Sequence, residues 1–253
     1  IFICTMFLSE LLHPISPNKF RDEIYEQRVY WWKAPPGASE RFSPLYSWEK
    51  FDAYLNDWRN ANHIQLADVN KDGQAVPGTG EKWDKGRDEN LTKGDVYNLW
   101  RHGHSVVLPF VEYQSQTLWT ICNTFEKQMP FGPGCANMYC SSKTNSHTFS
   151  PHRDDTENFL FHIDGQVKWR FYRKSKKKED KLVCYQDIIL GRGDLLYIPI
   201  GVYHDTQPLG PRLTASVHFP KPQKKDLEQS KKVGREKMYD WHKWFEFQRE
   251  IKL

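Results

Sequence analysis

The chain has 253 residues, of which 15% are aromatic, and its formal net charge is +4. So many aromatic residues exclude a disordered chain, and the length suffices for one large domain with a sizeable core. No stretch approaches the roughly 20 apolar residues of a membrane-spanning helix, so we expect no membrane association. The five cysteines include no Cys-x-x-Cys pair. This excludes a zinc framework or disulfide scaffold and favours a reducing cytoplasmic or nuclear compartment.

Residues 1–100 are predicted to form a mixed helical and strand region. A Ser-Pro start predicts a helix over 16–27. Apolar residues at helical spacing predict a second helix over 47–55, and the segment 92–102 also looks helical. The aromatic segment 29–32 is expected to be a strand between the first two helices.

The following 101–220 region is predicted to be a strand-rich core, because β-branched and aromatic runs alternate with Gly, Pro and Asn. Residues 159–172 are expected to form two strands joined by an Asp-Gly turn. Further strands are expected at 195–199 and 213–219. Residues 221–253 are predicted to be a basic helical tail, whose apolar stripe either packs on the domain or forms a homodimer contact.

Positive charge is concentrated in two segments. Residues 173–181 carry six basic and two acidic groups, and residues 221–237 carry seven basic and three acidic groups. Each segment is either an ordinary solvated surface or a contact for RNA or a ribonucleoprotein.

His152, Asp154 and His204 carry the strongest functional signal in the chain. In a strand, residues i and i+2 face the same way, so His152 and Asp154 point to one side and Arg153 points to the other. His204 follows a turn after a strand and could approach from the opposite side. Imidazole and carboxylate suit Fe(II), and two histidines with one carboxylate leave positions open for a co-substrate and dioxygen. The sequence therefore predicts that these three residues are the metal ligands of a catalytic centre.

Four motifs surround these residues. They are Asn-Met-Tyr at 137–139, Pro-His-Arg-Asp-Asp at 151–155, Gly-Gln-Val-Lys-Trp-Arg-Phe-Tyr at 165–172 and Gly-Asp-Leu-Leu-Tyr-Ile-Pro-Ile-Gly-Val-Tyr-His at 193–204. Through these motifs the chain resembles the JmjC branch of the cupin superfamily. This branch consists of Fe(II)- and 2-oxoglutarate-dependent oxygenases, and the chain resembles its ribosomal-protein hydroxylases in particular. The resemblance implies a mainly β fold with flanking helices, in which a double-stranded β-helix (jelly roll) holds Fe(II), 2-oxoglutarate and O2.

The same resemblance implies co-substrate residues. Asn137 and Tyr139 match a strand that lines the 2-oxoglutarate pocket. Asn158 matches a position beside 2-oxoglutarate, and His218 falls where relatives have Asn or Ser near it.

One position departs from the family pattern. The family usually has Lys or Arg about fifteen residues after the first histidine, to bind the distal carboxylate of 2-oxoglutarate, and this chain has Val167 there. Lys168 could supply the charge if a bulge re-aims it, because strand alternation points it away. Alternatively, Arg212 could bind the carboxylate, since Arg212-Leu-Thr214 resembles the Arg-x-Ser of other 2-oxoglutarate oxygenases.

These features favour an enzyme that hydroxylates an unactivated C–H bond on a protein side chain, as the ribosomal-protein hydroxylases do. A tRNA base and a free amino acid or biosynthetic peptide remain alternative substrates. A different class, a non-catalytic cupin that binds a metal or another ligand, is supported by Val167 in place of the family cation.

Overall fold

The computed structural model of the chain describes residues 8–56, 64–70, 74–79, 82–84, 92–129, 131–176 and 181–221. The helices are α1 (Leu8–Leu11), α2 (Pro17–Glu23), α3 (Trp48–Asn56), α4 (Lys93–His102) and α5 (Gln116–Gln128), with 3-10 turns η1 (Ser43–Leu45) and η3 (Val111–Gln114). The strands are β1 (Tyr30–Trp32), β2 (Gln65–Ala67), β3 (Lys82–Asp84), β4 (Val106–Leu108), β5 (Cys135–Ser141), β6 (Thr156–Asp164), β7 (Val167–Lys174), β8 (Leu182–Leu190), β9 (Leu195–Ile198), β10 (Tyr203–Pro208) and β11 (Arg212–Pro220).

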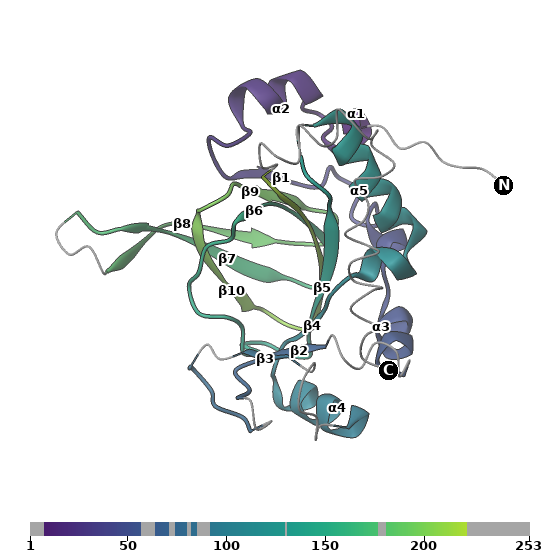
Figure 1. Ribbon diagram of the computed structural model, residues 1–253, viewed down its shortest axis with the longest axis vertical. Helices are drawn as coiled ribbons and strands as arrows, with labels where there is room; N and C mark the ends of the chain where they lie inside the picture. The colour runs from purple at the N-terminus through teal and green to yellow at the C-terminus, as the bar shows by residue number, and fades with distance from the viewer. Residues whose placement is uncertain are drawn as a thin grey trace, which may run out of the picture.

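Two antiparallel sheets face each other (Figure 1). The larger sheet has eight strands in the order β1-β9-β6-β11-β5-β4-β2-β3, and the smaller has three strands in the order β10-β7-β8. From β6 to β11 the chain passes repeatedly between the sheets: β6, β9 and β11 lie in the larger sheet, and β7, β8 and β10 lie in the smaller one. This arrangement gives the predicted double-stranded β-helix of the cupin fold. The boundary predicted at residue 100, between the N-terminal region and the core, stays a proposal. The strands before it, β1, β2 and β3, extend the same large sheet as the core strands.

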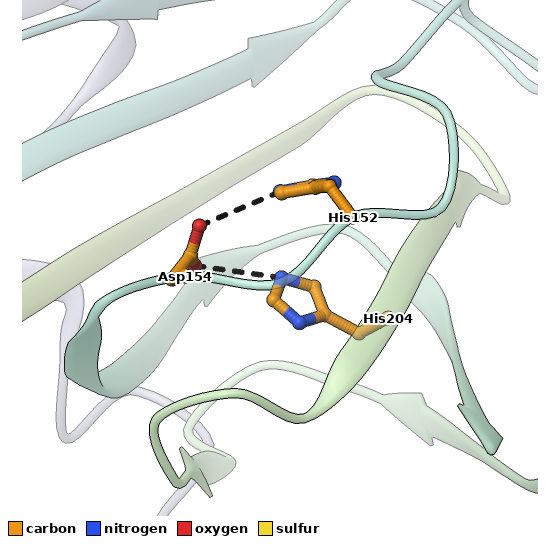
Figure 2. Close-up of side chains that lie close together, drawn as sticks. All are labelled: His152, Asp154 and His204. Carbon is orange, nitrogen blue, oxygen red and sulfur yellow. Dashed lines mark ion pairs between the residues drawn. The ribbon is translucent and has the colours of Figure 1, made fainter. Parts of the chain in front are cut away.

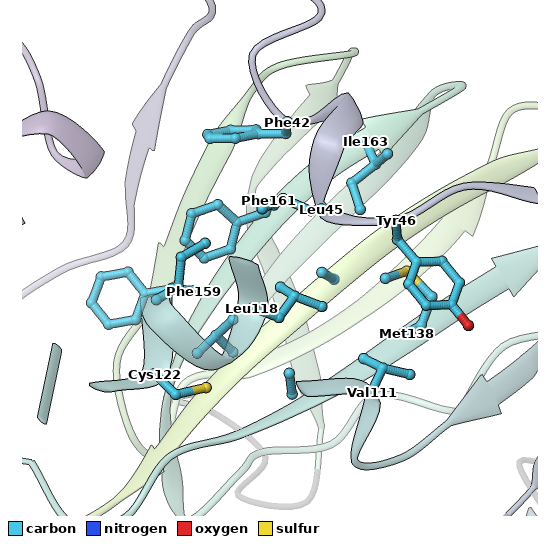
Figure 3. Close-up of a cluster of buried hydrophobic side chains, with 14 of the residues drawn as sticks. Phe42, Leu45, Tyr46, Val111, Leu118, Cys122, Met138, Phe159, Phe161 and Ile163 are labelled. Atoms are coloured by element: carbon cyan, nitrogen blue, oxygen red, sulfur yellow. The ribbon is translucent and has the colours of Figure 1, made fainter. Parts of the chain in front are cut away.

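Helix α5 covers the outer face of the large sheet (Figure 1). Leu118, Cys122 and Phe125 point from the helix into a buried cluster that includes Phe159 of β6, and the rings of Phe125 and Phe159 lie 4.3 Å apart between centroids (Figure 3 shows part of this cluster). Burying one such aromatic side chain stabilises the fold by roughly 1.5–3 kcal/mol. The packing of helix α5 therefore stabilises β5, β6 and β11, whose other faces line the interior of the barrel.

A second apolar cluster fills one part of the space between the sheets. Its buried members are Leu160, Val167, Trp169, Phe171, Ile188, Leu190, Leu196 and Ile198. Leu160, Trp169 and Ile198 also line the cavity described below, so the packed interior ends where the cavity begins.

The structure confirms the helices predicted near 16–27, 47–55 and 92–102 and the strand near 29–32. The strand-rich region after residue 101 also contains α5, which the sequence did not predict. The predicted Asp164-Gly165 turn joins β6 to β7, and these two strands belong to different sheets and do not form a hairpin.

The predicted tail at 221–253 lies outside the described residues except for its first residue. Among the residues that the structure describes, no helix is both long and apolar enough to span a membrane.

Glu157 is a buried acid on the outer face of β6. Its carboxylate accepts a hydrogen bond from the Tyr197 hydroxyl, while its other oxygen, Oε1, has no partner within the described parts of the chain. Burial raises the pKa of Glu157 to about 7, and the hydrogen bond from Tyr197 only partly opposes this. Glu157 is therefore protonated in the folded state at a pH where it is ionised in the unfolded chain.

We expect this acid to make stability fall as pH rises. Between the unfolded pKa of Glu157, about 4.3, and its folded pKa, only the folded state keeps the proton. The stabilisation that Glu157 contributes is therefore complete below the lower pKa and is lost as the pH rises through the higher pKa, by roughly 3 kcal/mol in total. Glu157→Gln should remove this part of the pH dependence. Urea unfolding of both proteins from acid to neutral pH measures it, and parallel stability curves for the two proteins would contradict it.

Candidate metal centre and cavity

Two segments bring the predicted ligands together. His152 and Asp154 lie between β5 and β6, and His204 lies on β10. The His152 N–H donates to the His204 carbonyl at 3.0 Å, and the His204 N–H donates back at 2.8 Å. The Gly201 N–H also donates to the Asp154 carbonyl, at 3.0 Å. Gly201 has φ +79°, which glycine adopts without steric cost, so this turn holds the two segments in register.

The side chains converge in the geometry that a metal ion needs (Figure 2). One ligand atom from each residue lies within 4.8 Å of the other two. Nε2 of His152 is 3.8 Å from Oδ1 of Asp154, and Nε2 of His204 is 3.6 Å from Oδ2 of the same carboxylate. The two imidazole nitrogens and one carboxylate are the donor set that Fe(II) takes in oxygenases.

Neighbouring groups fix which atoms are free to bind a metal. Nδ1 of His152 donates to the Ser150 carbonyl at 2.8 Å, and Nδ1 of His204 donates to the Val202 carbonyl at 2.9 Å. Both Nε2 atoms are thereby left as acceptors, as in protein metal sites where the second ring nitrogen is held by a hydrogen bond. Burial, followed by the nearby His152, lowers the pKa of His204, which keeps its imidazole neutral.

Asn158 supports the carboxylate. Its side-chain amide donates to Oδ2 of Asp154 at 2.8 Å, and its own oxygen accepts from Ser216 at 3.4 Å. Asn158 is buried and also lines the cavity.

We expect Asn158→Ala to loosen Asp154 and to weaken metal binding by about 10- to 100-fold, the effect typical of losing a hydrogen bond to a metal ligand. Titration with Co(II), followed by its visible absorption, measures the affinity. Thr156→Ala is the control, because Thr156 hydrogen-bonds to Asn158 but not to Asp154. An unchanged affinity in Asn158→Ala would show that the amide does not orient the ligand.

The triad borders an open cavity. Besides the triad and Asn158, its lining consists of Ala67, Ser105, Val107, Tyr139, Thr148, Phe149, Leu160, Trp169, Ile198, Thr206, Arg212 and Ser216. His204 is buried at its inner side, whereas His152 and Asp154 are partly exposed. A ligand can therefore reach the triad from the cavity.

Arg212 is the most unusual residue of this cavity. It lies on β11 with only 1% of its surface exposed. Its Nε donates a hydrogen bond to Ser141 at 3.0 Å, and its guanidinium lies 5.9 Å from the centroid of the Tyr139 ring. Within the described residues, no carboxylate lies at ion-pair distance from it. Burial lowers the pKa of Arg212 to about 10, so the group stays charged at neutral pH. A buried guanidinium without an anion costs free energy, which suits a site that receives one.

Lys168 is not brought to the cavity. Its ammonium lies 3.9 Å from Asp187 on the outer face of the small sheet. Val167 and Trp169 point inward from the same strand, as alternation requires. The bulge between β7 and β8 falls opposite Phe171 and Tyr172, where Tyr185 of β8 is the extra residue, and so does not re-aim Lys168.

The other predicted co-substrate residues lie on the strands around Arg212. Tyr139 lines the cavity, and its pKa is raised to about 12 by burial and by Asp154, against the effect of Arg212. Asn137 lies two residues before Tyr139 on β5, opposite Ser216. Thr214 is buried and bonds to His162 at 2.9 Å rather than lining the cavity. His218 is opposite Asn158, and burial lowers its pKa.

Sequence reasoning missed Ser141, Ser216 and Trp169. Ser141 and Ser216 lie two residues from Tyr139 and four from Arg212 on their strands, so strand alternation could have placed them on the cavity face. Trp169 packs against His204, with ring centroids 5.5 Å apart.

Comparison with known proteins agrees with this geometry. Residues 109–227 match the model of the JmjC domain. The bifunctional lysine-specific demethylase and histidyl-hydroxylase NO66 of Dictyostelium discoideum is 30% identical over 235 residues, or 84% of the chain. Ribosomal oxygenase 1 of Bos taurus is 30% identical over 220 residues, or 78% of the chain. The structure of YcfD, a ribosomal oxygenase from Escherichia coli in complex with cobalt and 2-oxoglutarate, has the same fold, with a TM-score of 0.60 and 17% identity over 86% of the chain.

These relatives are longer than the present chain. It covers 41% of the Dictyostelium protein, 30% of the bovine protein and 55% of the Escherichia coli structure. The activities named for the whole relatives therefore come to this chain only as a proposal.

Proposed function

We propose that this chain, whose residues 109–227 match the JmjC domain, is an Fe(II)- and 2-oxoglutarate-dependent oxygenase that hydroxylates an unactivated C–H bond. The observation that carries the proposal is the pairing of two features in one cavity. One is the convergent triad of His152, Asp154 and His204, and the other is the buried Arg212 without a carboxylate partner.

The residues present fit both groups. His152, Asp154 and His204 would hold Fe(II), and Arg212 would bind the distal carboxylate of 2-oxoglutarate through a charge-assisted hydrogen bond. When bound, the metal supplies the activation of dioxygen, which no side chain can provide. We assign the role predicted for either cation to Arg212, because the Lys168 ammonium lies 3.9 Å from Asp187 and Lys168 does not line the cavity.

The remaining residues orient these groups and exclude water. Asn158 holds the Asp154 carboxylate, Ser141 holds Nε of Arg212, and Tyr139 covers the guanidinium. Trp169 and Leu160 form an apolar wall beside the triad. Asn137, Thr214 and His218, which are not lining residues, remain proposed contributors to the co-substrate site through their positions on the same strands.

For the substrate, we propose a side chain on a protein. The relatives are named for histidyl hydroxylation and as ribosomal oxygenases, which favours a histidine of a ribosomal protein. Modification of a tRNA base or of a free amino acid or peptide remains the alternative. By the same relatives, we propose a cytoplasmic or nuclear location, in keeping with the free thiols of Cys122, Cys135, Cys140 and Cys184.

The first test is formation of succinate from 2-oxoglutarate with Fe(II) and ascorbate, in the wild-type chain and in His152→Ala. Turnover that the variant lacks supports an oxygenase. If neither turns over, binding of 2-oxoglutarate is measured in the presence of Co(II). Metal binding with no binding of 2-oxoglutarate would instead favour the non-catalytic cupin.

The substrate is tested next with histidine-containing peptides from ribosomal proteins, each paired with a version in which the histidine is replaced by alanine. Mass spectrometry should detect the gain of one oxygen atom only in the histidine peptide. Gain of oxygen on tRNA and not on any peptide would overturn the protein substrate while leaving the oxygenase intact.

A further inference from the structure

The β7–β8 hairpin extends away from the body of the protein (Figure 1). β8 is the edge strand of the small sheet and pairs only with β7 within the described residues. It has nine residues, and only its last part, at Ile188 and Leu190, is buried. An exposed edge of this length is a common site of association with another molecule.

The hairpin is strongly basic. Its described residues, 167–176 and 181–190, contain six Lys or Arg and one Asp, a net charge of +5. Two of these cations have acidic neighbours, since Lys168 lies 3.9 Å from Asp187 and Arg170 lies 2.7 Å from Asp205. For the other cations, no carboxylate among the described residues is within ion-pair distance; they are Arg173, Lys174, Lys176 and Lys181. The described part of the distal half of the hairpin is therefore a positive surface without acidic partners.

Exposed apolar and aromatic side chains lie next to these cations. Val183, Tyr185 and Ile189 of β8 have 40%, 46% and 46% of their surfaces exposed. Tyr185 is the extra residue of a bulge between Cys184 and Gln186, so Val183 lies on the face of Arg173 and Ile189 on the face of Lys168. The charge of Arg173 opposes the burial that raises the pKa of Tyr185, so the guanidinium and the phenol are neighbours. In register, Arg173 is opposite Val183, and Lys174 is opposite Leu182.

We propose that this hairpin binds single-stranded nucleic acid. The cations complement the phosphates, and the exposed Tyr185 ring offers a surface on which an unpaired base stacks. Sheets that bind single strands combine the same two elements, a positive surface and exposed aromatic rings. A peptide that added a strand to β8 would need neither the cluster of unpaired cations nor the ring. The proposal is independent of the proposed oxygenase activity, because the hairpin contributes to the cavity only through Trp169 near its base.

Fluorescence anisotropy with a labelled oligouridylate of roughly 20 nucleotides tests it in the full chain, over a range of salt concentrations. The charge variant is Lys174→Gln with Lys181→Gln. Its matched control is Lys33→Gln with Lys50→Gln, which removes the same charge from exposed positions elsewhere. We expect the first pair, and not the second, to weaken binding and to reduce the slope of log affinity against log salt by about 1.4, or about 0.7 per lost phosphate contact.

Tyr185→Ala should weaken binding by about 5- to 100-fold through lost stacking, whereas Tyr185→Phe should stay within about twofold of wild type. Tyr113→Ala, at another half-exposed tyrosine, is the control for loss of a surface ring. A DNA probe of matched length distinguishes RNA from DNA. Three results would each overturn the proposal. They are equal effects of the two charge pairs, competition by polyglutamate as strong as that by the unlabelled oligonucleotide, and self-association of the protein that depends on Tyr185. The His152→Ala variant should bind the probe as the wild type does.

Discussion

Asp154→Ala is expected to abolish metal-dependent turnover while the protein stays folded. The carboxylate lies between the two imidazoles, 3.8 and 3.6 Å from their Nε2 atoms, so its loss removes the ligand that both histidines face. Without it the site has two neutral donors and no charge to balance a divalent cation. We expect metal affinity to fall by more than about 100-fold, beyond the loss typical of a supporting residue, and turnover to fall to about 1% or less. Succinate formation and titration with Co(II) measure the two effects.

Arg153→Ala is the matched control for this variant. Arg153 lies between the two ligands in sequence, but its guanidinium packs on the Tyr203 ring, 5.4 Å from the centroid. Its loss should change neither metal affinity nor turnover by more than about twofold, the range of ordinary surface substitutions. Far-ultraviolet circular dichroism should be the same in both variants and in the wild type. Full turnover in Asp154→Ala, with this control unchanged, would exclude the triad as the metal site.

Local patterns were sufficient to predict the triad and most of the elements. His152 and Asp154 share a face because alternation needs only the spacing of two residues, even though the structure gives this segment an isolated bridge rather than a regular strand. The predicted start of α2 was also confirmed, because Ser16 caps the helix through its own side chain, a contact that depends on neighbours in sequence.

The missed features depend on contacts that are distant in sequence. Helix α5 has many β-branched and aromatic residues, which favour strands in isolation, but Leu118, Ile121 and Phe125 form a stripe that packs on the large sheet. At Gly165, the turn that resembles a hairpin is pressed against the neighbouring connection. A Cβ there would lie 1.9 Å from the carbonyl oxygen of Pro211. This glycine serves the close approach of two connections between the sheets, which no local pattern reveals.

The choice between Lys168 and Arg212 also needed the structure. Alternation already favoured the outward direction for Lys168, and only the position of the bulge could decide it. For Arg212, the sequence could not show that the strands around it supply Ser141 and Tyr139 but no carboxylate. The absence of a counter-charge within the described residues changes Arg212 from a possible surface cation into the proposed anchor of the co-substrate.

Arg212→Met is therefore expected to have opposite effects on co-substrate binding and on stability. The variant loses a charged hydrogen bond to the distal carboxylate of 2-oxoglutarate in a buried site. Such a loss costs about 2–5 kcal/mol, which should raise the KM for 2-oxoglutarate by at least ~30-fold. In the absence of 2-oxoglutarate, the same change removes a buried charge that has no anionic partner, so the melting temperature should be unchanged or higher. Initial rates against 2-oxoglutarate concentration and thermal unfolding without it measure the two effects.

Lys168→Met provides the matched control, because it removes the other candidate cation from the neighbouring strand. Its ammonium faces Asp187 outside the cavity, and an exposed ion pair of this kind contributes only about 0–1 kcal/mol. We therefore expect the KM of Lys168→Met to stay within about threefold of the wild-type value. The reverse result, a large KM effect in Lys168→Met and none in Arg212→Met, would transfer the co-substrate role to Lys168 and require β7 to rearrange on binding. A general loss of folding in Arg212→Met would appear as a lower melting temperature, which separates a structural role of the guanidinium from an anion-binding one.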